Sequence, residues 1–436
     1  AQQHKGYRSV VVPSLPAVLG YAQQHFGRLS LERVMRPAIR LAEEGYPISR
    51  LQRRQLGWCL ADLRASAATR ELFLKRGRRY RVGETFRQER LAETLGRLAD
   101  AGVQDFYHGE IARAIVEDMR AGGGLISDED LSAHDAPVRC GPISTAYRGG
   151  LVLSTPPPAG GLQVCVGLRL MEELSRGQAP SDPDDICAMA AEVIRAVFHE
   201  RERWSVHPRD VSPSLLRWLL SADRIGELSQ RVTSAMNEPT PADLSPGDPG
   251  DSGETTHLCT ADAEGNVVSL TQSIQSLFGA KVANARLGFL YNNYLRTCPR
   301  HRHPYALAGG CVPRSNASPT IVLSDGAPIL ALGAAGSRRI VSSVLQVVAG
   351  VFQQGLSCAD ALDAPRVHAQ SPRTLHIERP AATEPLLRRL RARFPRQRMR
   401  ARHSYFMGAV QAIHRLEAGW VGAADPRRGG TVAGVC

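Results

Sequence analysis

Lysine is almost absent from this 436-residue chain. It occurs only at positions 5, 75 and 281, so arginine supplies all but three of the 54 basic residues and most of the net charge of +12. A positive charge of this size is one property of nucleic-acid-binding proteins. The arginines are dispersed through amphipathic stretches such as residues 387–394, and no basic module interleaved with aromatic residues accompanies them. This distribution indicates arginines on solvent-exposed helix faces rather than a nucleic-acid-binding surface.

The chain also lacks a long apolar run and a cysteine framework. No run approaches the roughly 20 apolar residues that a membrane-spanning helix needs, so no membrane span is predicted. The nine cysteines are scattered, odd in number and without CxxC spacing, and several, such as Cys165, lie in apolar runs. This pattern argues against a disulfide scaffold or a zinc site. We expect buried reduced thiols, a cytoplasmic location, and neither a metal nor an organic cofactor.

The chain is longer than a single core usually allows, so one large or two intimate domains are expected. Residues 7–235 are predicted to be mostly helical, with helices at 30–44 (Ser30 as N-cap, Gly45 as stop, Pro37 as a kink or break), 86–101, 110–121 and 186–204. A loop rich in Pro, Gly, Asp and Ser follows at 238–252. Beyond it the sequence predicts a long helix at 340–354 and strands at 256–261, 267–273, 287–292, 319–323, 328–332 and 407–413. A hairpin connection at 262–266 is expected to join the first two strands.

The first chemical motif is residues 253–258 (Gly-Glu-Thr-Thr-His-Leu), which follow the loop and enter a strand. A self-cleaving precursor would be cut at such a place. Cleavage between Glu254 and Thr255 would give Thr255 a free α-amine beside its own hydroxyl, and a neighbouring amine is one recognised way to activate a Thr nucleophile. Taken alone, the segment favours the simpler interpretation of a loop that ends in a Thr-rich edge strand.

Two further segments carry candidate chemistry. Residues 329–340 predict a buried strand, a Gly-rich turn and a helix start, whose backbone N–H groups favour negative charge and can form an oxyanion hole. Taken alone, this loop favours an ordinary strand-to-helix turn. The turn is not a P-loop, because no Gly-Lys-Ser/Thr follows. Residues 313–326 place small hydroxyl and amide side chains before a strand, where they either bind a substrate carboxylate or cap a turn.

The order of these motifs resembles that of the γ-glutamyltransferases, a branch of the N-terminal-nucleophile hydrolases. The matching segments extend over nearly the whole chain: 12–20, 36–45, 105–111, 154–161, 255–258, 262–269, 278–279, 291–293, 318–323, 333–340, 365–370, 408–413 and 424–428. The resemblance implies an α+β fold, a four-layer αββα sandwich. It also implies a precursor cut into a large-subunit region, 1–254, and a small-subunit region, 255–436, which form one intertwined fold and can assemble further.

The resemblance also assigns catalytic roles. Thr255 would be the nucleophile and its α-amine the general base. Gly336 and Ser337 stand where the family has two glycines that supply oxyanion N–H groups, and backbone donation survives a change from Gly to Ser if the local φ is tolerated. Ser273 stands where the family has a Thr beside the nucleophile.

The substrate-binding positions depart further from the family. Ser315 and Asn316 stand at a Ser-Ser pair that holds the acyl end of the substrate. Gln275, Tyr294 and Thr297 stand where the family uses an Asn, a Gln and an Asp around the γ-glutamyl amino and carboxyl groups. Loss of that Asp removes the counter-ion of a substrate ammonium, which is costly when desolvated. Separately, Arg339 matches a family Arg and is expected to act structurally or electrostatically near the site.

In the family, an Arg that pairs with the glutamyl carboxylate precedes the region matched by Ala1. The given sequence opens Ala-Gln-Gln-His, without Met or an apolar signal core, and contains no counterpart of that segment. We expect either a trimmed or partly represented chain, or a homologue that functions without this Arg. Glutathione is therefore not the expected substrate.

The sequence thus predicts a self-processing amidohydrolase or acyltransferase that acts on an amide of a small acidic metabolite with altered acyl specificity. Three alternatives stay open. They are a γ-glutamyl transferase or glutathione hydrolase proper, a biosynthetic homologue that breaks another bond next to a carbonyl, even carbon–carbon, and an uncleaved scaffold protein.

Overall fold

The computed structural model describes residues 2–176, 180–205, 207–236, 253–299, 303–371 and 373–434. The chain divides into two compact units, of which the first contains residues 1–139 and 273–298 and the second contains 140–272 and 299–436. These units do not coincide with the predicted regions 1–254 and 255–436, since each unit takes chain from both. The division at Thr255 concerns cleavage and stays a prediction. The predicted loop at 238–252 lies outside the described residues.

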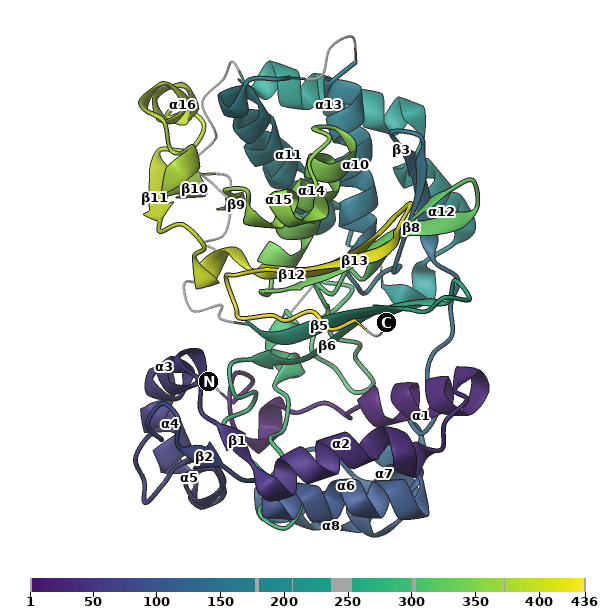
Figure 1. Cartoon of the computed structure of the whole chain (residues 1–436), viewed down its shortest axis with the longest axis vertical. Helices are drawn as coiled ribbons and strands as arrows, with labels where there is room; N and C mark the ends of the chain where they lie inside the picture. The colour runs from purple at the N-terminus through teal and green to yellow at the C-terminus, as the bar shows by residue number, and fades with distance from the viewer. Residues whose placement is uncertain are drawn as a thin grey trace. The chain divides into compact units, whose positions relative to one another are not determined.

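The first unit is mainly helical (Figure 1). Its elements are α1 (Leu15–Phe26), α2 (Leu31–Glu44), β1 (Tyr46–Pro47), α3 (Arg50–Trp58), α4 (Leu60–Ala65), α5 (Ala67–Phe73), β2 (Thr85–Phe86), α6 (Glu89–Ala101), α7 (Asp105–His108), α8 (Glu110–Ala121) and α9 (Asp128–Ser132), with short 3₁₀ turns η1 (Tyr7–Ser9) and η3 (Tyr294–Thr297). Two apolar cores hold them. One is centred on α8, where Ile115 and Met119 are fully buried, and the other lies around Leu63 and Phe86.

Helix α2 shows how local signals set an element. Ser30 caps it by accepting a hydrogen bond from the Arg33 backbone N–H at 3.3 Å, and Gly45 ends it at a φ of 80°, a conformation that glycine adopts without a Cβ penalty. Of the two outcomes predicted for Pro37, the break does not occur, because α2 is a single helix from Leu31 to Glu44.

The predicted strand at 287–292 is wrong. This stretch is irregular chain with one isolated bridge between Ala283 and Leu290. The Asn284 side chain accepts hydrogen bonds from the backbone N–H groups of Arg286 and Leu287, and this Asx turn competes with strand pairing. Apolar alternation alone did not reveal the turn.

The second unit is built on a six-stranded antiparallel sheet of order β13-β12-β8-β7-β4-β3. Its strands are β3 (Ile143–Tyr147), β4 (Gly150–Ser154), β7 (Thr320–Ser324), β8 (Ala327–Ala335), β12 (Ala409–Leu416) and β13 (Gly419–Ala424). Helices α10 (Gly161–Leu174), α11 (Pro183–Arg203), α13 (Ala222–Met236) and α14 (Arg339–Phe352) lie on one side of the sheet (Figure 1). The largest apolar core of the chain lies between sheet and helices, and Leu332 and Val344 are fully buried there.

A two-stranded sheet of β5 (Gly253–Ala261) and β6 (Val267–Ser276) lies on the other side of β8 and β12 (Figure 1). The Asp262 backbone N–H donates to the Asn266 carbonyl at 3.1 Å, which closes the predicted hairpin. The strand begins at Gly253 rather than at Thr256, so Thr255 is its third residue and not a residue before the strand. The helices, the six-stranded sheet and β5 thus form three successive layers within this unit.

The second unit also contains several shorter elements. They are α12 (Pro213–Leu219), α15 (Cys358–Asp363), β9 (Val367–Ser371), β10 (Thr374–Glu378), α16 (Glu384–Leu390) and β11 (Arg396–Arg400), with 3₁₀ turns η2 (Pro208–Asp210), η4 (Arg379–Ala381) and η5 (Tyr405–Met407). Strand β10 pairs with β9 antiparallel and with β11 parallel.

A buried charge network joins β10 to the segment that follows β13. Arg427 binds Glu378 and Asp425, and Asp425 also binds Arg366 at 2.6 Å. Two positive and two negative charges therefore compensate one another in the protein interior, where all four side chains are at most 2% exposed. Among the described residues, no helix is both long and apolar enough to cross a membrane.

Candidate active site

The Gly-rich turn between β8 and α14 has a backbone that suits glycine. Gly336 has a φ of 139° and Ser337 a φ of 55°, both in the left-handed region. Ser337 therefore carries the conformation of the glycine expected at this position, at a cost of about 1–2 kcal/mol for a residue with a Cβ. A Cβ on Gly336 would lie 2.7 Å from the Cα of Gly408, so the turn packs backbone against backbone.

The start of β5 lies against this turn. A Cβ on Gly253 would lie 2.9 Å from the backbone nitrogen of Ser337 and 2.9 Å from its Cβ, so only glycine fits here without displacement. Gly253 is two residues before Thr255 and is buried, whereas Thr255 and Glu254 are partly exposed. The predicted cleavage site and the predicted oxyanion turn are thus brought together, although 81 residues lie between Thr255 and Ser337 in the sequence.

The side chain of His257, a residue of β5, packs against Gly333 of β8. Its ring bonds the Thr271 hydroxyl at 2.8 Å through Nδ1 and the Cys259 thiol at 3.1 Å through Nε2, and it fills the space above Gly333. Burial lowers the pKa of His257 to about 3 and raises the pKa of Cys259 to about 12. A neutral, enclosed imidazole beside a neutral thiol is not a Cys–His nucleophile pair, which agrees with a packing role for His257.

The turn at 405–408 contacts both the start of α14 and, through Arg428, the start of β5. From α14, the Arg339 Nε donates to the Phe406 carbonyl at 2.8 Å and the Ser343 hydroxyl donates to the Met407 carbonyl at 2.8 Å. Arg339 is almost fully buried and its guanidinium lies 4.5 Å from the centre of the Phe406 ring. These contacts hold the start of α14 against Phe406, as in the structural one of the two roles expected for Arg339.

Arg428 joins the same anchor to β5. Its Nη1 donates to the Gly253 carbonyl at 3.1 Å, its Nη2 donates to the Tyr405 carbonyl at 3.3 Å, and its guanidinium stacks 3.9 Å from the centre of the Tyr405 ring. No motif had singled out Arg428 or Tyr405. The available signal was the segment 424–428, which belongs to the family resemblance but suggests no role for its last residue.

The predicted acyl-binding pair, Ser315 and Asn316, is held by Arg201, which no sequence motif had indicated. The Arg201 guanidinium, at the end of α11, donates to the Asn316 side-chain oxygen and to the Ser315 carbonyl, the latter at 2.7 Å. Loss of hydration and then the neighbouring Arg314 lower the pKa of Arg201 to about 10. The Ser315 hydroxyl accepts from the Ala317 N–H at 3.1 Å, so part of the pair caps its own turn.

Four of the predicted residues belong to the first unit. The Ser273 hydroxyl accepts from the Gln275 N–H at 2.9 Å, and Gln275 has a φ of 77° at the end of β6. Tyr294 and Thr297 begin and end η3, where the Thr297 hydroxyl donates to the Tyr294 carbonyl at 2.9 Å. Their assignment to a substrate pocket stays a prediction.

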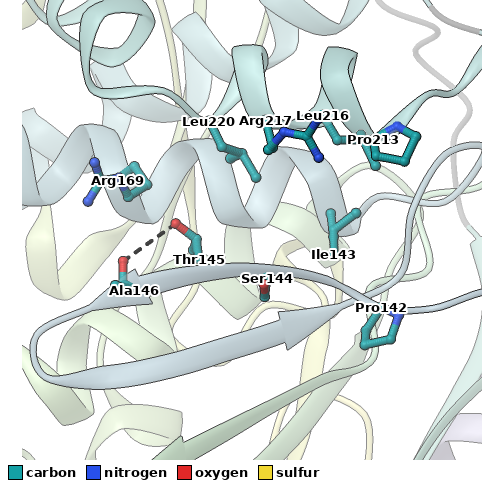
Figure 2. A pocket seen from close by; sticks show the side chains of 10 residues that line it. All are labelled: Pro142, Ile143, Ser144, Thr145, Ala146, Arg169, Pro213, Leu216, Arg217 and Leu220. Carbon is teal, nitrogen blue, oxygen red and sulfur yellow. Dashed lines mark hydrogen bonds between the residues drawn. The ribbon is translucent and has the colours of Figure 1, made fainter.

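A pocket of about 450 Å³ lies elsewhere in the second unit, between β3, α10 and α12 (Figure 2). Arg169, Arg217 and Thr145 line it together with apolar side chains, and the Thr145 hydroxyl donates to the Ala146 carbonyl at 3.5 Å. None of the predicted site residues lines this pocket. Within the described part of the chain, no group of three or more His, Cys, Asp or Glu side chains could hold a metal ion.

The arrangement of strands and helices defines the class of protein. The chain superposes on the crystal structure of a cephalosporin acylase from Bacillus halodurans with a TM-score of 0.88 and 26% identity, covering 99% of this chain and 80% of the other. The chain accordingly has the α+β fold of the N-terminal-nucleophile hydrolases.

Sequence comparison narrows the class to a family. The model of the family described as gamma-glutamyltranspeptidase matches residues 1–435. A glutathione hydrolase proenzyme from Escherichia coli is 30% identical over 433 residues, which are 95% of this chain and 73% of that protein. An acylase proenzyme from a Pseudomonas species is 31% identical over 368 residues, 83% of this chain and 64% of that protein. The chain belongs to the γ-glutamyltranspeptidase family of amide hydrolases and acyltransferases.

Proposed function

We propose that this chain is a self-processing threonine amidohydrolase or acyltransferase that acts on an amide of a small acidic metabolite. The observation that supports it best is the packing of Gly253 against Ser337, which brings the strand that carries Thr255 to the turn at the start of α14. A nucleophile and an oxyanion site must lie within reach of one carbonyl group. Both relatives are named as proenzymes, which supports a precursor that is cut into two subunits.

Processing would begin with the Thr255 hydroxyl. Its Oγ adds to the carbonyl carbon of Glu254, the N–H groups of Gly336 and Ser337 stabilise the oxyanion, and the hydroxyl proton passes to the amide nitrogen as the C–N bond breaks. Water then hydrolyses the resulting ester. The products are a Glu254 carboxylate and a Thr255 residue with a free α-amine.

The mature enzyme would repeat the attack on a substrate. The α-amine of Thr255 accepts the hydroxyl proton, Oγ attacks the substrate amide carbonyl, and the leaving amine takes the proton as the acyl-enzyme forms. Water or an acceptor amine then releases the acyl group.

The proposed acyl group is anionic and has no free α-amino group. The guanidinium of Arg201 binds Ser315 and Asn316. Arg314 and Arg338 also act on it, against the single carboxylate of Glu202, so the charge near this pair is positive on balance. By resemblance, Gln275, Tyr294 and Thr297 replace the residues that hold a γ-glutamyl amino group. An ammonium without its counter-ion costs about 3 kcal/mol, on the order of 100-fold in kcat/KM.

The mass of the intact protein under denaturing conditions tests the processing. The wild-type chain is expected as two fragments divided between Glu254 and Thr255, and Thr255→Ala as a single chain. Thr256→Ala is the matched control, because it changes the neighbouring Thr on the same strand and is expected to be cut. A wild-type chain that stays uncut on incubation would instead support the scaffold alternative.

Turnover of glutaryl-p-nitroanilide and γ-glutamyl-p-nitroanilide by the cut protein tests the substrate. The expected result is a preference for the glutaryl compound. A preference for the γ-glutamyl compound would indicate a γ-glutamyl transferase or hydrolase proper, the activity in the name of the Escherichia coli relative. A cut protein that turns over neither compound would favour the biosynthetic alternative.

A further inference from the structure

Arg428 holds the segment that precedes the proposed scissile bond. Its Nη1 donates to the carbonyl of Gly253, one peptide unit before the Glu254 carbonyl that Thr255 would attack. The bond joins residues 175 positions apart, so it depends on the folded chain and not on local sequence. A hydrogen bond from a charged donor is stronger than one between neutral groups.

The guanidinium is itself fixed on two sides. It lies on the face of the Tyr405 ring, 3.9 Å from the ring centre, and donates to the Tyr405 carbonyl. The preceding residue, Arg427, is completely buried in its network with Glu378 and Asp425. The backbone that carries Arg428 is therefore held in place, and little side-chain entropy remains to be lost when the guanidinium binds Gly253.

The proposed oxyanion turn at Gly336 and Ser337 packs on the same segment, residues 405–408. Gly336 packs on Gly408, directly after the 3₁₀ turn that begins with Tyr405, and Arg339 binds the Phe406 carbonyl. The position of Gly253 and the position of the Gly336–Ser337 turn are thus both set relative to residues 405–408. In an extended chain successive carbonyls point in opposite directions, so holding the Gly253 carbonyl also sets the direction of the Glu254 carbonyl.

We propose that Arg428 is a positioning residue for self-cleavage, which orients the Gly253–Glu254 peptide against the oxyanion turn through its bond to the Gly253 carbonyl. This inference rests on the proposed function, since it requires cleavage at Glu254–Thr255. Arg428 binds the segment to be cut at the Gly253 carbonyl, one peptide unit before the carbonyl that reacts. Its loss should slow cleavage without abolishing it, on the order of 10- to 100-fold, as expected for one hydrogen bond from a charged donor.

The test is the first-order rate of cleavage of the purified full-length chain, followed by intact mass. Arg428→Ala is expected to accumulate as precursor and to cut slowly, Arg428→Lys to recover part of the rate, and methylguanidinium added to Arg428→Ala to restore cleavage. Arg415→Ala, which removes an exposed arginine from β12, is the control and should cut at the wild-type rate. Rescue by the added cation separates positioning from a loss of folding, because a misfolded chain would not respond to it.

The anchor can be tested separately. Tyr405→Phe keeps the ring under the guanidinium and should cut as wild type, whereas Tyr405→Leu removes the ring and should slow cleavage. Wild-type rates for Arg428→Ala together with a normally cut wild-type chain would overturn the inference and leave the proposed function standing. A wild-type chain that is never cut would overturn both.

Discussion

The buried imidazole of His257 allows us to predict how far the free energy of unfolding falls when the pH is lowered. His257 is 5% exposed, and burial lowers its pKa from 6.5 to about 3. The folded protein therefore binds fewer protons than the unfolded chain below pH 6.5, and the stability that depends on the neutral ring is lost as the pH falls from 6.5 towards 3. The loss amounts to about 1.4 kcal/mol for each pH unit below the unfolded value.

Replacing the ring should remove that dependence. His257→Gln cannot take up a proton, so the free energy of unfolding should fall between pH 7.5 and pH 5.5 by about 1.4 kcal/mol less than in the parent chain. The loss of packing over Gly333 lowers stability at both pH values and cancels from the difference. Buried His376, whose pKa is also lowered to about 3, adds the same acid sensitivity to parent and variant alike.

Urea unfolding at the two pH values measures the effect. All chains should carry Thr255→Ala, so that a single polypeptide is compared, and His134→Gln serves as a control for the loss of an exposed imidazole. Equal pH dependence in His257→Gln and the parent would refute the reasoning, because it would show that the ring takes up no extra proton on unfolding. A larger dependence in the variant would refute it as well.

Two further predictions concern the residues around the site. Ser337→Gly should raise the free energy of unfolding by about 1 kcal/mol, because it relieves a side chain at a φ of 55°, and an unchanged or lower urea midpoint would contradict the strain. Arg427→Met should lower stability by about 3–5 kcal/mol, because it leaves Glu378 and Asp425 buried without their shared counter-charge, whereas Arg415→Met on the exposed face of β12 should change it by less than about 0.5 kcal/mol. Similar urea midpoints for the two arginine variants would show that the network is not the source of that stability.

Elements with strong local signals were predictable from the sequence. Ser30 and Gly45 bound α2 as expected, the predicted helix at 340–354 is α14 within two residues, and the hairpin around residues 262–266 is present. Caps, left-handed glycines and turns depend on contacts within a few residues, so the sequence carries them. The strand expected at 287–292 failed for the same kind of reason, since a local Asx turn outweighed apolar alternation.

The candidate site was predictable only in its order along the chain. The motifs around Thr255, Ser315 and Gly336 follow one another as in the family, and that order is enough to indicate the family. It could not show that Gly253 packs on Ser337, that Arg201 holds Asn316, or which residue of the segment 424–428 binds the strand that carries Thr255.

The sequence by itself determined the family, the Thr255 hypothesis and the positions where the chain turns, because each depends on residue type and spacing. Only the tertiary structure decided the partners of Arg428, Arg201 and Gly336. Each of these contacts joins residues far apart along the chain, and their meeting depends on how the six-stranded sheet orders its strands and where α11 and α14 pack upon it. Local propensity carries no information about such meetings, which arise from the burial of a shared core.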